Sequence, residues 1–338
     1  REVGVPGAPR AGLPAALLVA GLVAGCGSNG SPAQPAMALP IAPAPAPPAG
    51  PAAAGTVTPL GAPATQVVVD PRTATVAVAL ADPPRLLLST LDGTAPPRQV
   101  ALPGPAADLV LVAAGGPLLV PISVPGSLVR VPLDGGALSR TDLDGPAYGA
   151  LAMGETTVVA MGDRLTVLDG PARTIPGFVD ATRLVPAGTK VVVLDRGRSA
   201  VSLVDVSSEQ TGPALRAGNG AAAVVSDRFG RLLVTDVRDG ELLVFAGDPL
   251  LLRQRFPLPG APYGVAYDPR RDLAWVTLTA RNEVVGLDVT GGEPVVVHRF
   301  PTVHQPDAVA VDPASGRVVI VSASGAGLQV IDPERVVR

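Results

Sequence analysis

Short apolar runs recur along most of the chain, and turns rich in glycine, proline and aspartate separate them. A run of small aliphatic residues opens each repeat of this pattern. These opening runs begin at Thr65, Ala107, Tyr148, Asp180, Ala221, Tyr263 and Asp307. Consecutive starts lie 42, 41, 32, 41, 42 and 44 residues apart. A period near forty residues is typical of repeat proteins, whose units pack against their neighbours, so the pattern predicts seven units.

Each unit shows the same order of four extended runs. In the sixth unit they read "YGVAYDP", "LAWVTL", "EVVGLDV" and "VVHRFPT". A turn follows the first run, often at an Asp-Pro pair such as residues 268–269, where proline presets φ and aspartate caps the turn. Four antiparallel strands in about forty residues are typical of a propeller blade. We therefore predict an all-β fold, a seven-bladed β-propeller of four-stranded antiparallel blades; a pair of β-sandwiches is the structural alternative.

The seventh unit ends without a fourth strand. It stops after "GLQVIDPERVVR", whereas "GTVTPLGAP" at residues 55–63 matches the fourth-strand tails of other units. We expect Thr56–Leu60 to pair against residues 327–332 as the outer strand of the last blade. Such a closure removes an open sheet edge. It bounds the propeller at residues 56–335 and places the preceding segment at the rim of the last blade.

The third unit is the shortest, with only 32 residues before the next start. Its turns, at "MGETTV" and "MGDRLTVLDGPARTIPGF", are trimmed. We expect these shortened loops to leave a notch in the rim of the ring.

Two stretches carry a family resemblance. Residues 264–289, "GVAYDPRRDLAWVTLTARNEVVGLDV", and residues 308–332, "AVAVDPASGRVVIVSASGAGLQVID", resemble the seven-bladed YVTN/YncE-like propellers. The tetrad that names the family is degenerate here, as Trp275-Val276-Thr277-Leu278. The resemblance covers residues 56–335 and implies the seven-bladed fold. Its motifs are packing motifs, so it implies no particular activity.

The first 25 residues have the form of a secretory signal peptide. Two arginines, Arg1 and Arg10, precede the apolar run "LPAALLVAGLVAGC" at residues 13–26. The end of this run resembles a bacterial lipobox, with Val23 in place of the usual leucine. The resemblance implies that Cys26 is lipidated and becomes the new N-terminus, and two or three acyl chains make such an anchor stable. A simple cleaved signal and an uncleaved anchor are the alternatives.

Residues 27–55 carry no charge and consist mostly of alanine and proline. Frequent proline prevents both a helix and a paired strand. We expect residues 26–55, which comprise the lipidated cysteine and this segment, to be an extended tether with about 3.1 Å per residue. The implied location is extracytoplasmic, with the protein lipid-anchored to the outer face of the bacterial cytoplasmic membrane.

Composition excludes several classes of function. The net charge is −3 and basic residues form no stripe, so nucleic acid is not an expected partner. A single cysteine excludes an internal disulfide and any multi-cysteine metal site. The stretch "GNGAAA" at residues 218–223 links two strands, whereas a dinucleotide site requires a helix after the glycines. We expect no catalytic residue, metal or cofactor.

The best candidates for a site lie where the first strands begin, because in a propeller these positions surround one mouth of the axis. They are Asp108, Tyr148, Asp180, Tyr263, His304 and Asp307. Loops between second and third strands, which carry Arg196 and Asn282 among others, should reach the same face. The second histidine, His298, lies in an outer strand and should be solvated.

The function predicted from these features is that of a membrane-anchored binding module. It would bind a protein, peptide or cell-wall component through the mouth face. A lactonase-like propeller hydrolase is the alternative, with Asp108, Asp180, Asp307 and His304 as its acidic and histidine set. A purely structural role, in which the mixed charges are only a solvated surface, is a third reading.

Overall fold

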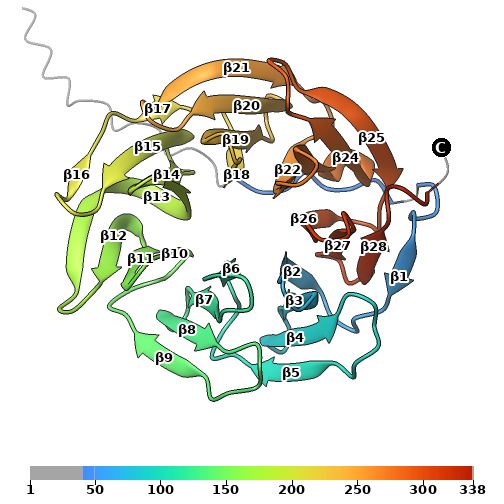
Figure 1. Ribbon diagram of the computed structural model, residues 1–338, viewed down its shortest axis with the longest axis horizontal. Coiled ribbons are helices and arrows are strands. Elements are labelled where there is room, and N and C mark those ends of the chain that lie inside the picture. Colours follow the sequence, from blue (N-terminus) through green and yellow to red (C-terminus); the bar gives the residue numbers. More distant parts are fainter. Residues whose placement is uncertain (1–40, 49, 337–338) are drawn as a thin grey trace, which may run out of the picture. The chain divides into compact units, whose positions relative to one another are not determined.

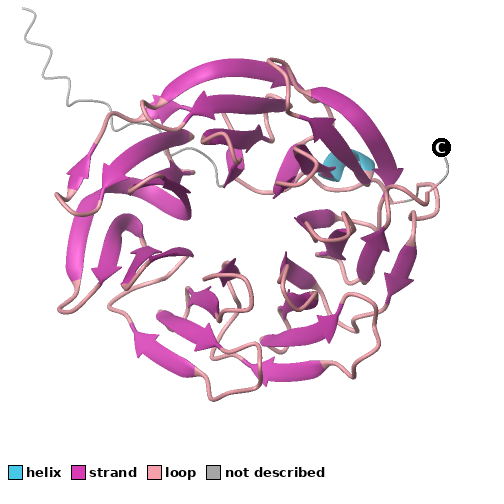
Figure 2. Cartoon of the chain, viewed as in Figure 1, coloured by secondary structure: helices cyan, strands magenta, loops and turns pink. Residues whose placement is uncertain are grey.

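The computed structural model describes residues 41–48 and 50–336. These residues form antiparallel sheets arranged around a central axis, with one short 3-10 helix, η1 (Thr279–Arg281), in a loop (Figures 1 and 2). Within the described ranges, no helix has the length and apolar character needed to cross a bilayer. The fold is all-β, as the alternation of apolar runs and turns predicts.

The first two sheets each contain four strands in chain order, with the first strand nearest the axis (Figure 1). The first comprises β2 (Ala64–Val69), β3 (Thr75–Leu80), β4 (Arg85–Thr90) and β5 (Arg98–Ala101). The second comprises β6 (Val110–Leu111), β7 (Leu118–Ile122), β8 (Ser127–Val131) and β9 (Ser139–Asp142).

The next sheet has eight strands and explains the short third unit. It comprises β10 (Gly149–Met153), β11 (Thr156–Ala160), β12 (Gly162–Leu168), β13 (Arg173–Ala187), β14 (Lys190–Asp195), β15 (Ala200–Asp205), β16 (Gln210–Thr211) and β17 (Leu215–Arg216). The first part of β13 pairs with β12, and its residues from Ala181 onward pair with β14. An outer strand therefore runs directly into the next inner strand, and the connecting loop found elsewhere is missing. This missing connection shortens the unit. The sequence predicts a notch in the rim here, but the two cavities described below lie at the axis and beside β25 (Val295–Pro301).

Two further four-stranded sheets follow. One comprises β18 (Ala221–Ser226), β19 (Arg231–Asp236), β20 (Glu241–Ala246) and β21 (Leu251–Pro257). The other comprises β22 (Pro262–Asp268), β23 (Leu273–Leu278), β24 (Glu283–Asp288) and β25 (Val295–Pro301). The described residues thus form five four-stranded sheets, counting the closing sheet below, and one eight-stranded sheet.

The closing sheet joins both ends of the chain, as predicted. It contains β26 (Pro306–Val311), β27 (Val318–Ser322), β28 (Leu328–Ile331) and, at its outer edge, β1 (Thr56–Thr58). In the pairing of β1 with β28, Thr56 lies opposite Val330 and Thr58 opposite Leu328. Gly55 precedes β1 with φ +72°, and a Cβ there would lie 2.2 Å from the Val330 carbonyl oxygen. Only glycine permits this approach.

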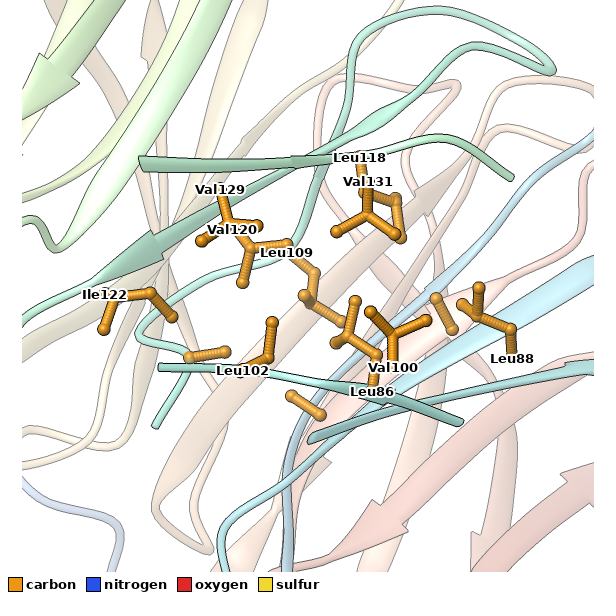
Figure 3. Packing of buried hydrophobic residues seen from close by; sticks show 13 residues of the cluster. Leu86, Leu88, Val100, Leu102, Leu109, Leu118, Val120, Ile122, Val129 and Val131 are labelled. Carbon is orange, nitrogen blue, oxygen red and sulfur yellow. The ribbon is translucent and has the colours of Figure 1, made fainter. Parts of the chain in front are cut away.

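The core lies between neighbouring sheets, because each sheet presents an aliphatic face to the next. Figure 3 shows the packing of the first sheet on the second, where Leu86 and Val100 meet Leu118 and Val120. Each of these four side chains is less than a tenth exposed. Burial of one such side chain contributes roughly 1.5–3 kcal/mol, so the interfaces between sheets hold the ring together.

Buried aspartates cap the turns that follow the first strands. The carboxylate of Asp312 accepts hydrogen bonds from the amides of Ala314 and Ser315. Asp70 does the same for Thr73 and also accepts a 2.6 Å hydrogen bond from the amide of Gly115, in the next sheet. The Asp-Pro turns of the sequence therefore have the predicted capping role, and one of them also ties two sheets together.

His298 departs from expectation. Its ring stacks on Trp275, with 5.5 Å between ring centroids, and lies 5.8 Å from Phe300. The histidine is half-buried in β25 and is not simply solvated. Gly286 of β24 makes room for the indole, since a Cβ there would lie 2.9 Å from the Trp275 ring.

The segment before β1 lies against the ring in its described parts, residues 41–48 and 50–55. The amide of Ala54 donates to the Pro301 carbonyl (3.0 Å), and Gln329 Nε2 donates to the Ala54 carbonyl (2.7 Å). In Figure 1 this segment crosses the part of the ring that contains β22 and reaches β1 at the rim. The sequence placed the exit of the tether at the rim, whereas the structure continues the segment inward from there.

Candidate binding site at the mouth of the axial cavity

The inner strands surround an axial cavity of about 680 Å³. Its wall is mainly aliphatic, because the inner strands that border it consist mostly of small aliphatic residues. Wall residues include Val67, Val69, Val110, Leu184, Val225, Val265, Val309 and Val311. A few side chains near the starts of the strands supply the charged groups of this otherwise apolar wall.

Four of the six predicted site residues line this cavity. They are Asp108, Tyr148, Tyr263 and Asp307. The other two, Asp180 and His304, are not among its lining residues. Two arginines join the lining instead, Arg183 and Arg196. A third tyrosine, Tyr267, also lines the cavity, which therefore combines two carboxyl groups, two guanidinium groups and three phenols.

Arg183 and Asp108 form the most buried ion pair of the site. Arg183 Nη1 lies 3.5 Å from Asp108 Oδ2, and the two side chains are 19% and 14% exposed. The same nitrogen donates to the carbonyls of Ala107 (3.2 Å) and Tyr148 (3.3 Å). Burial raises the pKa of Asp108, and the adjacent Arg183 charge opposes that rise. These contacts commit both charges to each other and to the backbone.

Sequence reasoning missed Arg183, although it left a signal. In "DATRLVP" the arginine occupies the middle of an inner strand, a place that other units fill with small or aliphatic residues. A charged side chain at a crowded axis needs partners. A single break in an otherwise apolar column was therefore enough to mark the position.

Arg196, unlike Arg183, forms no ion pair with a carboxylate among the described residues. Its Nε donates to the Ala222 carbonyl (2.9 Å), and its guanidinium carbon lies 5.8 Å from the centroid of the Tyr263 ring. Burial lowers the pKa of Arg196, while the neighbouring Tyr263 and Asp180 favour its charged form. A desolvated guanidinium that has no paired carboxylate is chemically suited to bind an anion.

Asp307 is the complementary case. Gln305 Nε2 donates to its Oδ1 (2.7 Å), and within the described part of the chain no cation pairs with it. Burial raises the pKa of Asp307 to about 6, and the hydrogen bond from Gln305 only partly offsets this. A carboxylate in such a place favours a ligand that brings a positive charge.

Asp180 and His304 have local roles outside the cavity. The Asp180 amide donates to Asp195 Oδ1 (3.0 Å), and burial raises the pKa of the Asp180 carboxyl, opposed by Arg196. His304 Nδ1 is 2.8 Å from Ser324 Oγ. The acidic and histidine set expected of a hydrolase does not converge on the cavity.

Two other features, a second cavity and a group of carboxylates, are weaker candidates for a binding site. A second cavity, of about 850 Å³, lies between the outer strand β25 and the segments around Ala54 and Glu334. A group of three carboxylates, Asp236, Asp239 and Glu241, has oxygens within 4.8 Å of one another. Arg255 already lies 2.7 Å from Glu241, and backbone and side-chain amides bind the other two.

Comparisons with known proteins give the fold. No family model and no curated protein matches the sequence. Among solved structures, a chain of Kuenenia stuttgartiensis hydrazine synthase superimposes with a TM-score of 0.70 and 15% identity, over 82% of this chain and 97% of that one. Virginiamycin B lyase from Staphylococcus aureus superimposes with a TM-score of 0.68 and 12% identity, over 81% and 97%.

The chain folds as a β-propeller. A third structure, the β-propeller domain of Cps50 (Swd1) from Myceliophteria thermophila, agrees with this at a TM-score of 0.68 and 13% identity, over 80% of this chain and 96% of that one. These propellers differ in function, and identities this low establish the architecture alone.

Proposed function

We propose that this β-propeller is a lipid-anchored extracytoplasmic binding module whose mouth cavity takes a peptide or a peptide-like component of the cell wall. The observation that supports the proposal is that one cavity is lined by two opposite charges that hydrogen-bond to neighbouring groups but form no ion pair within the described part of the chain. Among the described residues, no cation pairs with Asp307 and no carboxylate pairs with Arg196, whereas Asp108 and Arg183 pair with each other. A ligand with a free ammonium and a free carboxylate would satisfy both.

We also propose that the ring has seven blades. The eight-stranded sheet contains two sets of four strands, joined through β13, and the other five sheets contain one set each. Seven sets agree with the seven sequence units and with the resemblance to YVTN/YncE-like propellers. A seven-bladed ring leaves an axial space that side chains only partly fill.

The wall of the cavity supports a peptide more than a highly charged ligand. Aliphatic side chains form most of its lining, and Tyr148 and Tyr263 add flat apolar surface beside the charges. Sites with mainly apolar walls and a few placed polar groups are typical for small ligands. A peptide offers apolar side chains for the wall and charged termini for Arg196 and Asp307.

The anchoring part rests on the N-terminal pattern. Residues 1–25 would be the signal peptide and Cys26 the lipidated residue, in a segment outside the described residues. Full-length protein expressed in a bacterium with labelled fatty acid should carry the label and sediment with membranes. Cys26→Ser should abolish the label and release the protein, and label retained on that variant would contradict the anchor.

The geometry does not favour the lactonase-like alternative. Asp108 is committed to Arg183, and His304 and Asp180 lie outside the cavity lining. A general base must reach the reacting group to within about 3 Å. Among the described lining residues, this leaves Asp307, whose carboxyl accepts a hydrogen bond from Gln305 and forms no ion pair.

Calorimetry with tripeptides tests the ligand class. A library of tripeptides with free ends should contain binders, and blocking either end by acetylation or amidation should weaken them about tenfold or more, since a charged hydrogen bond contributes roughly 1.5–3 kcal/mol. Asp307→Asn should weaken binding only of peptides with a free ammonium. His304→Gln, outside the cavity, is the matched control. Equal binding of free and blocked peptides, or no binding at all, would overturn the proposal.

A further inference from the structure

The alanine–proline segment Ile41–Pro48, "IAPAPAPP", is bound to the face of the propeller by side chains. The amide of Ala46 donates to Gln305 Oε1 (3.0 Å), and Gln305 Nε2 donates to the Ala44 carbonyl (3.1 Å). Asn282 Nδ2 donates to the Pro47 carbonyl (2.9 Å). Two amide side chains thus bind three backbone groups of a segment that offers no polar side chain.

The spacing of these contacts matches a polyproline II helix. That helix has three residues per turn and no internal hydrogen bonds, so its backbone groups remain free for a partner. The Ala44 and Pro47 carbonyls are three residues apart and therefore point the same way along such a helix. Alternate prolines fix φ before binding, which lowers the entropy lost when the segment docks.

The receptor side is preorganised. Asn282 follows η1 in the left-handed conformation (φ 51°) and is 6% exposed. Its Oδ1 accepts a hydrogen bond from the backbone amide of Gln305 (3.0 Å). The Gln305 side chain is also held by Asp307 (2.7 Å). Both amides are thus oriented by the ring itself. Loss of the segment would remove the Pro47 carbonyl from Asn282 Nδ2, which would then have to bind water instead.

We propose that Asn282 and Gln305 form a recognition site for one turn of polyproline II helix, and that the chain's own Ile41–Pro48 is its ligand. The inference goes beyond the proposed function, because it requires neither the lipid nor a ligand in the cavity. It fixes where the N-terminal segment leaves the ring: beside the mouth face, next to Asp307, and not at the rim.

Two proline substitutions in the segment test the site in the full chain. Ala46→Pro removes the amide that donates to Gln305, and Ala42→Pro adds the same ring at a position whose amide lies outside these contacts. NMR relaxation of the Ala44 amide should give an order parameter near the rigid value of about 0.85 in the unmodified protein and in Ala42→Pro. In Ala46→Pro it should fall below about 0.6.

A variant of the propeller residue Asn282 tests the same contact independently of the segment. Asn282→Asp keeps the oxygen that accepts from the Gln305 amide but loses the donor to Pro47, so it should mobilise Ala44 as Ala46→Pro does. Its melting temperature and the amide shifts of β22–β28 show whether the fold is intact. A mobile Ala44 in the unmodified protein, or equal effects of Ala42→Pro and Ala46→Pro, would overturn the proposal. So would a rigid Ala44 in folded Asn282→Asp.

Discussion

Asp307 carries the clearest pH dependence of the site. Its folded-state pKa of about 6 lies above the ordinary value of 3.8, because burial disfavours the carboxylate. The folded state therefore holds the proton more tightly than the unfolded chain. The resulting stability is fully present below about pH 4 and is lost as the pH rises through about 6.

Asp307→Asn should remove this dependence, because the amide stays neutral and can still accept from Gln305. Relative to the unmodified protein, the variant should gain free energy of unfolding between pH 4 and 7, by up to about 3 kcal/mol. Urea unfolding at pH 4.5 and 7.5 measures the difference. The exposed Asp134→Asn is the control, and a gain that is equal at both pH values would contradict the assignment.

Gly286 provides a second single-residue test. A methyl group there would lie 2.9 Å from the Trp275 ring, so Gly286→Ala should cost about 1–3 kcal/mol of unfolding free energy through overpacking. A Cβ at Gly292 meets nothing within 4 Å, so Gly292→Ala should be nearly neutral. Urea unfolding followed by the fluorescence of the single tryptophan measures both. Equal costs would show that glycine flexibility, not the indole contact, decides the effect.

At the scale of strands, the sequence was most informative where a pattern repeats. The closing role of residues 56–58 followed from their match to other fourth strands, and the pairing of β1 with β28 confirms it. The continuous β13 could not be foreseen, because Pro176 and Gly177 read as a break. Proline is tolerated in an outer strand, where one edge has no partner, and glycine permits the φ of 114° found there.

Around the mouth of the cavity, too, the sequence predicted some positions and not others. Residues at the start of inner strands could be placed, since strand direction alone sets them at one face. The contacts of Ile41–Pro48 could not, because alanine and proline give no sequence signal for docking. Its receptors, Asn282 and Gln305, come from loops of different sheets.

A disulfide across the closing pair tests that element. Thr56 and Val330 are directly opposite in antiparallel strands, where Cα atoms lie about 4.5–5.5 Å apart, a distance that a disulfide can bridge. Thr56→Cys with Val330→Cys, on a Cys26→Ser background, should raise the melting temperature by several degrees when oxidised. Reduction should reverse the gain. Thr56→Cys alone is the control, and failure of the pair to oxidise would contradict the register.

For the whole molecule, the important feature is that both ends of the chain meet in one sheet. A fragment of residues 60–338 lacks β1 and leaves the edge of β28 open, and an open edge invites pairing with another chain. We expect this fragment to melt at a lower temperature and to associate, as measured by light scattering after size-exclusion chromatography. A fragment of residues 51–338 keeps β1 and should remain monomeric. A monomeric, equally stable 60–338 fragment would show that closure contributes little.

The bound N-terminal segment also determines how a pulling force would enter the molecule. Under the proposed anchor, 14 residues lie between Cys26 and Ile41, so 15 steps of about 3.1 Å give a reach of at most about 45 Å. Tension from the membrane would act first on the contacts of Asn282 and Gln305. The hydrogen bonds of Ala54 with Pro301 and Gln329 would be loaded next, and β1, which is paired over three residues, only after them. The short pairing that closes the ring would thereby be shielded from mechanical stress.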